Sequence, residues 1–223
     1  MVADPVRAST RVSIAWSGAP AQEDTDTLVL TINGYSLDLR VVLPGHAGAG
    51  TLDWGTVGLV VELEGSTPDK PLLRWDNILD SHPAPPADLE PLDDVGSFSA
   101  LPNGDVLETG AMFNPKTARN EPYDEVWRRL PVPAGAAYFV LERADGRAFV
   151  GRVGALALGA WSEGAQYAAW RDELDGSAWR RVYAFGEAGN VPAAPVEVPA
   201  EWRKDAVVTL GEHTWTVRTV GTV

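Results

Sequence analysis

Apolar and polar residues alternate along much of the chain, a period of two that is typical of β-strands. Across residues 35–43 every odd position is apolar, whereas the intervening Ser36, Asp38 and Arg40 are polar. The alternation predicts a strand with one face on a core and the other in water. Residues 27–32 alternate in the same way and precede Asn33-Gly34, a dipeptide that tolerates the positive φ angles of a tight hairpin turn.

Further short strand-like runs follow, and most are joined by turns that contain glycine. They cover residues 58–64, 95–101, 105–113, 138–142, 147–153, 179–185, 207–210 and 214–220. No segment has the periodicity of a helix of twelve or more residues. Many short strands with glycine-containing turns predict an all-β protein built as antiparallel barrels or sandwiches.

Two segments fit a helix or a strand. Residues 123–130 lie between Pro122 and Pro131, and their acidic residues precede their basic ones, which suits a helix dipole. Their apolar residues suit a strand equally well, and residues 72–79 are similar. We expect strands at both places.

Proline-rich stretches suggest the domain organisation. Residues 81–94 are rich in proline and acid and predict an exposed, irregular loop. Residues 131–135 separate two sets of strands, so we expect a first domain at 1–132 and a second, smaller one at 133–223. A barrel formed by the shorter second domain has little room for a large cavity.

Composition narrows the functional classes. The chain has 223 residues, no cysteine and a formal net charge of -13, from 18 basic and 31 acidic residues. This balance argues against nucleic-acid binding and against attraction to anionic membranes, and no run of residues is apolar enough to cross a bilayer. With no secretory signal at residues 1–5, no cysteine and no glycosylation sequon, we expect a location in the cytoplasm or nucleus rather than secretion.

An ordered set of short motifs resembles the fungal HRI-one protein family. The motifs lie at residues 52–55, 74–81, 107–115, 123–128, 182–192, 207–208 and 215–217. The resemblance implies two consecutive lipocalin-like antiparallel barrels in an intracellular fungal protein, with no established reaction and no catalytic residues to transfer. The family name also suggests a casein kinase I as a protein partner. The chain departs from the family pattern at Ala118, where a glycine is usual and where a left-handed backbone would be costlier for alanine.

The densest group of ionisable and aromatic residues is Glu108, Tyr123, Glu125, Trp127 and Arg128. Glu108 and Arg128 could hold the polar head of a ligand inside a barrel, with Trp127 as an apolar wall. We favour the alternative that they form a structural cross-strand charge pair beside an aromatic plug. In an extended strand, Tyr123, Glu125 and Trp127 share one face and Arg128 lies on the other.

The nine tryptophans divide between the two predicted barrels. Trp54 and Trp75 join Trp127 as candidate pocket walls in the first barrel, whereas we expect four of the five tryptophans of the second domain to fill its core. Those four are Trp161, Trp170, Trp179 and Trp215. The candidate ligand-binding residues are therefore Trp54, Trp75, Glu108, Tyr123, Glu125 and Trp127.

No motif predicts a metal site, a cofactor or a catalytic triad. His46, His82 and His213 have no metal-ligand spacing, and no nucleophile elbow or phosphate-binding glycine loop is present. We expect no metal and no cofactor.

Three functional hypotheses follow. The first is a non-catalytic binding or interaction module for a small apolar ligand or a protein partner. The second is an interaction module in kinase signalling, supported by the proline-rich loop and by Ser97, which has Asp94 three residues upstream. The third is an isomerase or cyclase type of enzyme that uses a carboxylate of the first barrel wall, Glu108 or Glu125, with Tyr123.

Overall fold

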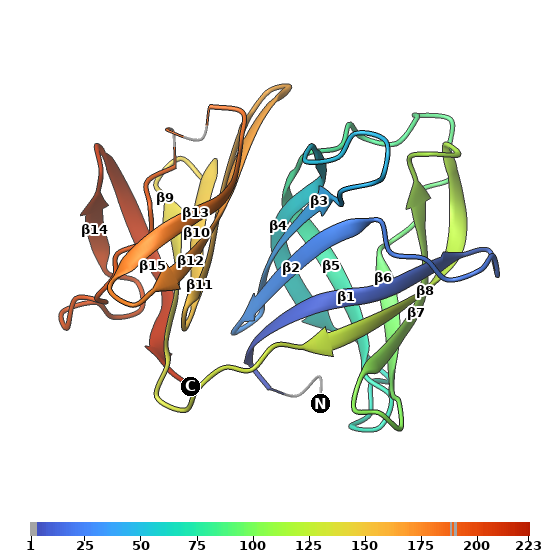
Figure 1. Ribbon diagram of the computed structural model, residues 1–223, viewed down its shortest axis with the longest axis horizontal. Helices are drawn as coiled ribbons and strands as arrows, with labels where there is room; N and C mark the ends of the chain where they lie inside the picture. The colour runs from blue at the N-terminus through green and yellow to red at the C-terminus, as the bar shows by residue number, and fades with distance from the viewer. Residues whose placement is uncertain (1–3, 188, 190) are drawn as a thin grey trace.

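The computed structural model describes residues 4–187, 189 and 191–223, and these contain fifteen β-strands (Figure 1). Eight belong to the first unit: β1 (Val6–Trp16), β2 (Thr25–Ile32), β3 (Tyr35–Val42), β4 (Leu52–Glu62), β5 (Leu72–Asp80), β6 (Val95–Ala100), β7 (Val106–Asn114) and β8 (Arg119–Arg129). Seven belong to the second: β9 (Ala137–Arg143), β10 (Ala148–Val153), β11 (Leu156–Glu163), β12 (Gln166–Asp175), β13 (Ala178–Phe185), β14 (Val207–Leu210) and β15 (His213–Thr222).

The first unit is a closed antiparallel barrel in which each strand pairs with the next along the chain. Closure comes from β1, which pairs with β2 on one side and with β8 on the other. The predicted turn at Asn33-Gly34 joins β2 to β3 with φ angles of 48° and 87°. Positive φ at both central residues gives a two-residue turn a twist that matches the right-handed twist of the flanking strands.

The second unit is a seven-stranded antiparallel sheet in the order β13-β12-β11-β10-β9-β15-β14. Its tryptophans Trp161, Trp170 and Trp215 are buried in one hydrophobic cluster, and Trp179 packs against that cluster. Residues 191–206 contribute to the same cluster, for example through Trp202, whose ring lies edge-on to Phe139 at 5.3 Å. One core of the second unit is therefore built largely from aromatic residues.

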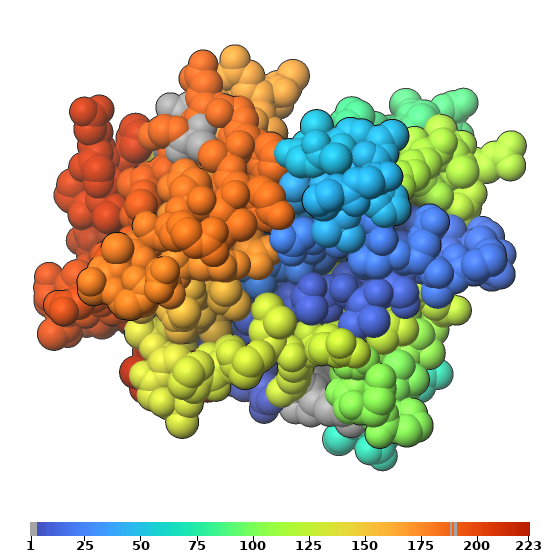
Figure 2. Space-filling view, viewed as in Figure 1, coloured from blue at the N-terminus to red at the C-terminus, as the bar shows by residue number. Residues whose placement is uncertain are grey.

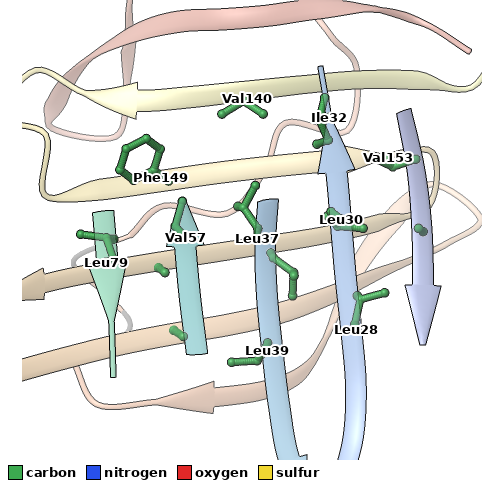
Figure 3. Packing of buried hydrophobic residues seen from close by; sticks show 14 of the residues in the cluster. Leu28, Leu30, Ile32, Leu37, Leu39, Val57, Leu79, Val140, Phe149 and Val153 are labelled. Carbon is green, nitrogen blue, oxygen red and sulfur yellow. The ribbon is translucent and has the colours of Figure 1, made fainter. Parts of the chain in front are cut away.

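The largest hydrophobic core lies between the two units. It combines residues of the barrel wall, such as Leu28, Leu37 and Val57, with residues of the second sheet, such as Phe149 and Leu158. Figure 3 shows the barrel strands running across the strands of the sheet, with Leu37, Val57 and Phe149 among the side chains between them. In Figure 2 the two units accordingly lie directly against each other.

Small residues and polar contacts allow this close approach. A Cβ on Gly151 would lie 2.9 Å from the Leu37 side chain, and one on Gly55 would lie 2.6 Å from the Tyr167 hydroxyl. Across the same boundary, Arg171 forms a 2.8 Å ion pair with Asp26, which also accepts a hydrogen bond from Tyr183. Packing and charge pairing together hold the barrel to the sheet.

The all-β prediction, with two consecutive antiparallel units, is confirmed. Residues 72–79 lie in the strand β5 and residues 123–129 in the strand β8, so both segments are strands, as expected. Ala118 adopts a left-handed φ of 54°, which explains why glycine suits that turn.

Two further expectations concern targeting and membranes. We expect no secretory signal at residues 1–5, and residues 1–3 of that segment lie outside the described residues. The described part of the chain contains no helix with the length and hydrophobicity that a membrane crossing needs.

The prediction that the polar face of residues 35–43 lies in water is wrong. Ser36 and Arg40 are buried, and Ser36, Asp38 and Arg40 all line the inside of the barrel. The apolar face of the same strand, with Leu37 and Leu39, points outward into the core between the units. The physical reason is that the second sheet covers the outer face of the barrel, so the polar residues have only the interior left to occupy.

Shortening a side chain in the shared core tests the coupling between the units. Leu37 is 1% exposed, so Leu37→Ala should lower the free energy of unfolding by about 2–5 kcal/mol. The matched control, Leu59→Ala, changes a side chain of the same barrel that is 38% exposed and should have a smaller effect. Chemical denaturation followed by tryptophan fluorescence and circular dichroism measures both. Two separate transitions, only one of them moved by Leu37→Ala, would contradict a shared core.

Candidate functional site

The barrel encloses a cavity of about 100 Å³ lined by side chains from all eight strands and from Asp94. We call this space the barrel cavity. Its wall contains the charged residues Arg7, Asp38, Arg40, Asp94, Glu108, Glu125 and Arg129. It also contains the aromatic residues Trp54, Trp75, Phe98, Tyr123 and Trp127. The interior of this barrel is therefore polar and charged, with aromatic walls.

Arg40 organises the charges inside the barrel. Its guanidinium donates to Asp38 at 2.8 and 2.9 Å and to Oε1 of Glu125 at 3.2 Å. The guanidinium also lies over the ring of Trp54 at 4.9 Å and faces that of Trp127 at 5.8 Å. Burial alone would lower the pKa of Arg40, but the Asp38 and Glu125 carboxylates raise it above its usual value.

A second arginine completes this network. Nη1 of Arg11 donates to Oε1 of Glu125 at 2.8 Å, so that one carboxylate oxygen accepts from both Arg11 and Arg40. The remaining donors of Arg11 bind Glu23 at 2.8 and 3.0 Å and Thr25 at 3.0 Å. Because burying a charge without a partner costs several kcal/mol, these pairings are what allow the arginines inside the barrel.

Glu108 differs from the other buried acids because its hydrogen-bond partners are neutral. It is 4% exposed and accepts from the Tyr123 hydroxyl at 2.7 Å and from Nε1 of Trp127 at 2.8 Å. Among the described residues, no salt bridge includes Glu108. Burial, with a contribution from the Glu125 carboxylate, raises the pKa of Glu108 to about 8. Glu108 is therefore protonated in a large fraction of molecules at neutral pH.

Two glycines make room for this carboxyl group. Gly96 of β6 and Gly110 of β7 are directly paired across the strands. A Cβ on Gly96 would lie 2.5 Å from Oε1 of Glu108, and one on Gly110 would lie 2.6 Å from the Tyr123 hydroxyl. Any larger residue at either position would push the Glu108–Tyr123 pair out of place. The two glycines thus leave the space that the Glu108 and Tyr123 side chains occupy.

Asp94 and Asp38 add two further acceptors to the cavity wall. Burial, together with the Glu125 carboxylate, raises the pKa of Asp94 to about 7. The backbone carbonyl of Asp94 accepts from the amide of Trp75 at 3.0 Å, which fixes this residue beside β5. Oδ1 of Asp38 is buried and has no hydrogen-bond partner, although Oδ2 binds Arg40.

The six residues selected from the sequence all lie in the wall of the barrel cavity: Trp54, Trp75, Glu108, Tyr123, Glu125 and Trp127. The pairing of Glu108 with Arg128 is wrong. Arg128 lies on the outside of the barrel, where its side chain is 56% exposed and pairs with Asp105 at 2.7 Å. Successive residues of a strand face opposite ways, so Arg128 cannot share the interior with Trp127.

Sequence reasoning missed the part of the wall contributed by other strands. The alternation predicts a solvated face for Asp38 and Arg40, the composition predicts a loop for Asp94, and no motif selects Arg7 or Arg129. The alternation of Asp38 and Arg40 with apolar residues marks them as one face of the hairpin, but it does not show whether that face meets water or the barrel interior.

The remaining candidate sites are less suited to chemistry. A larger hollow of about 660 Å³ lies on the second unit, with a wall made mainly of exposed polar residues such as Glu163, Glu212 and His213. His82 stacks on Trp54 and hydrogen-bonds to the carbonyl of Asp53 at 2.8 Å, which is a structural role. Within the described residues, no group of three or more acidic, histidine or cysteine side chains could hold a metal ion.

Comparison with known proteins identifies the family to which the chain belongs. The model of a family described as Protein HRI1 matches residues 7–219. The chain belongs to the HRI1 family. A solved structure, the crystal structure of the uncharacterized protein YLR301w from Saccharomyces cerevisiae, superimposes with a TM-score of 0.78 at 16% sequence identity, covering 98% of this chain and 100% of that chain. At this identity, the likeness of that structure to this HRI1-family chain concerns the fold. A search of curated proteins found no match.

Removing Arg40 tests the charge network. Arg40→Ala leaves Asp38 without its cation and Glu125 with only Arg11, so the free energy of unfolding should fall by about 3–5 kcal/mol. Arg74→Ala is the matched control, because Arg74 also pairs with an aspartate two residues away, but in an exposed position. Its effect should be much smaller. Equal losses in urea denaturation would contradict the structural importance of the interior pair.

The pH dependence of stability tests the state of Glu108. Because its pKa is higher in the folded protein than in the unfolded chain, the folded form retains a proton that the unfolded form releases. Stability associated with Glu108 is therefore complete below about pH 4.5 and is lost as pH rises toward about 8. Glu108→Gln should remove this loss, worth about 1.4 kcal/mol per pH unit for one proton. Denaturation between pH 5 and pH 8 measures it, and parallel curves for both proteins would contradict the raised pKa.

Proposed function

We propose that the protein is a non-catalytic binding protein that holds a small polar molecule in the barrel cavity. The observation that supports this most directly is the incomplete pairing of the cavity wall. Glu108 faces neutral donors, Oδ1 of Asp38 has no partner, and both lie beside aromatic rings. A few polar groups that converge on an aromatic-lined space are typical of small-molecule sites.

The character of the wall favours a polar ligand over the apolar ligand expected from the sequence. An apolar molecule would leave the carboxyl groups of Glu108 and Asp38 without new partners while displacing any water that bonds to them. The proposed binding residues are the six selected from the sequence, Trp54, Trp75, Glu108, Tyr123, Glu125 and Trp127, with Asp38 added.

The size of the cavity limits the ligand. A volume of about 100 Å³ is below the range of about 300–1,000 Å³ for drug-sized ligands. A dry cavity of about 150 Å³ accepts benzene. The ligand is therefore a compound of only a few non-hydrogen atoms, or the small end group of a longer one.

Native mass spectrometry combined with a cavity-filling variant tests the proposal. The side chain of Val29 lines the barrel cavity, so Val29→Phe should fill part of the space. After incubation with a metabolite extract, the wild-type protein should carry a small-molecule adduct that Val29→Phe lacks. Val207→Phe makes the same change at a side chain of the second sheet that is 70% exposed and should keep the adduct. A wild-type protein with only its own mass, or an adduct retained by Val29→Phe, would contradict binding in the barrel.

An enzyme of the isomerase or cyclase type is a second candidate function. The supporting observation is Glu108 itself, because a buried carboxyl group with a pKa near 8 can act as a general acid at neutral pH. Tyr123 donates to this carboxyl group and would help to orient it. Incubating the metabolite extract with wild-type protein and with Glu108→Gln separates the two functions. Binding alone leaves the composition of the extract unchanged, whereas catalysis converts a component in the wild-type sample only.

The interaction with a kinase remains a prediction from the sequence. Ser97, the candidate phosphosite, lies within β6 and is paired with Leu72 on one side and Thr109 on the other. Kinases require an accessible segment, so this position argues against phosphorylation of Ser97 in the folded protein. A casein kinase I partner would instead have to bind an exposed surface, such as residues 82–91.

A further inference from the structure

We propose that the barrel cavity binds a small organic ammonium ion, with its positive charge against Glu108 and its apolar part among Trp75, Phe98 and Trp127. This inference rests on the proposed function and specifies the class of ligand. It follows from the charge balance of the wall, from the position of the aromatic rings and from the space reserved for Glu108.

The charge balance favours a cation. Arg40 is already engaged by Asp38 and Glu125, and Arg129 pairs with Asp4. In contrast, no salt bridge of the described residues includes Glu108, although Arg7 and Arg40 attract it electrostatically from other parts of the wall. The wall therefore contains a buried acid without a salt-bridged counter-ion among the described residues, and its four acids outnumber its three arginines. A bound cation would supply this counter-ion in a place where the low polarity strengthens the attraction.

A second acceptor lies in the same cavity. Oδ1 of Asp38 is buried without a hydrogen-bond partner, although Asp38 contributes to the cavity wall. Buried polar atoms of native proteins are nearly always bonded, and an exception needs an explanation such as a water molecule or a ligand. An ammonium group or a water molecule held beside it could donate to this oxygen.

Aromatic rings surround Glu108 on the neighbouring strands. Phe98 of β6 is directly paired with Glu108, and the ring of Trp75 lies 5.9 Å from that of Phe98. The indole of Trp127 contacts the Glu108 carboxyl group through Nε1. Aromatic faces attract organic cations and also cover their methylene groups. An acid enclosed by aromatic rings thus suits an alkylammonium ion better than a hydrated metal ion.

The carboxyl group is also held in place for this role. Gly96 and Gly110 provide the space beneath Glu108 and Tyr123, and two hydrogen bonds fix the carboxyl orientation. A fixed group loses little conformational freedom when a ligand arrives, which favours binding.

Binding of a cation should displace the proton of Glu108 into solvent. Several charged or titratable groups influence Glu108 from the surrounding strands and loop: Arg7, Arg40, Asp94, Tyr123 and Glu125. Their net effect together with burial raises the pKa of Glu108 to about 8. Below that pH the cation must compete with the proton, so its affinity should fall about tenfold per pH unit.

Three probes of equal heavy-atom number test the inference: propylammonium, 1-propanol and acetate. Each is titrated to tens of millimolar at constant ionic strength, because few atoms give weak binding. The indole N–H resonance of Trp127 is followed by NMR. Propylammonium should shift this resonance saturably, with an affinity at least tenfold higher at pH 8.5 than at pH 6.5, and calorimetry in two buffers at pH 7 should detect proton release. Glu108→Gln, in which the amide retains an acceptor for Tyr123 or Trp127, should abolish the binding and its pH dependence.

The outcomes separate this inference from the proposed function. Saturable binding of 1-propanol or acetate without binding of propylammonium would overturn the ammonium assignment and leave a small-molecule site in the barrel. Equal shifts with propylammonium and with sodium chloride, or unchanged binding by a folded Glu108→Gln, would also overturn it. If Glu108→Gln fails to fold, the pH dependence of the wild-type protein decides, since pH-independent binding contradicts a role for the Glu108 proton. No response to any probe, together with no adduct in native mass spectrometry, would overturn both proposals.

Discussion

The packing of the second sheet against the outside of the barrel is the constraint on which the rest of this structure depends. A small barrel in water normally buries its apolar residues inside. Here the second sheet covers the outward residues Leu28, Leu30, Leu37 and Leu39. The apolar face of β2 and β3 is therefore buried on the outside of the barrel. The inward positions of the same strands are then free to carry polar residues, as Thr27, Ser36 and Arg40 do. The second unit is therefore a condition for the polar interior of the first.

A polar interior must still satisfy its own charges. Arg11 and Arg40 share the Glu125 carboxylate and each has a further acidic partner, which compensates most of the cost of burial. Glu108 is not part of this network. It accepts hydrogen bonds from Tyr123 and Trp127, and its raised pKa favours the protonated, neutral form. The contrast between these two carboxylates, one fully paired with arginines and one with neutral donors, is what distinguishes a structural network from a candidate site. It also explains why the same cavity wall supports a binding function and, as an alternative, acid catalysis.

Much of the fold could be predicted from the sequence, because alternation and turn dipeptides report local geometry. The hairpin at Asn33-Gly34 and the strand nature of residues 72–79 and 123–130 follow from such local signals. The strand β1 was missed because its inward residues are polar and its outward face contains Ala8, so the contrast between faces is weak. β12 was missed because it is rich in alanine and acidic residues, which are poor strand formers, and only tertiary packing makes it a strand.

Local sequence patterns predict only part of the wall of the candidate site. Glu108, Tyr123, Glu125 and Trp127 could be selected because β7 and β8 are neighbours along the chain, and strand parity alone places Arg128 on the opposite face. Asp38 and Arg40 could not, because alternation separates two faces without saying which one meets water. A solvated surface and a polar barrel interior require the same residue types, and only the position of a second, distant sheet decides between them. For this reason the residues that reach the cavity and those that form the interface with the second sheet lie side by side on β3, and any change in that interface also acts on the site.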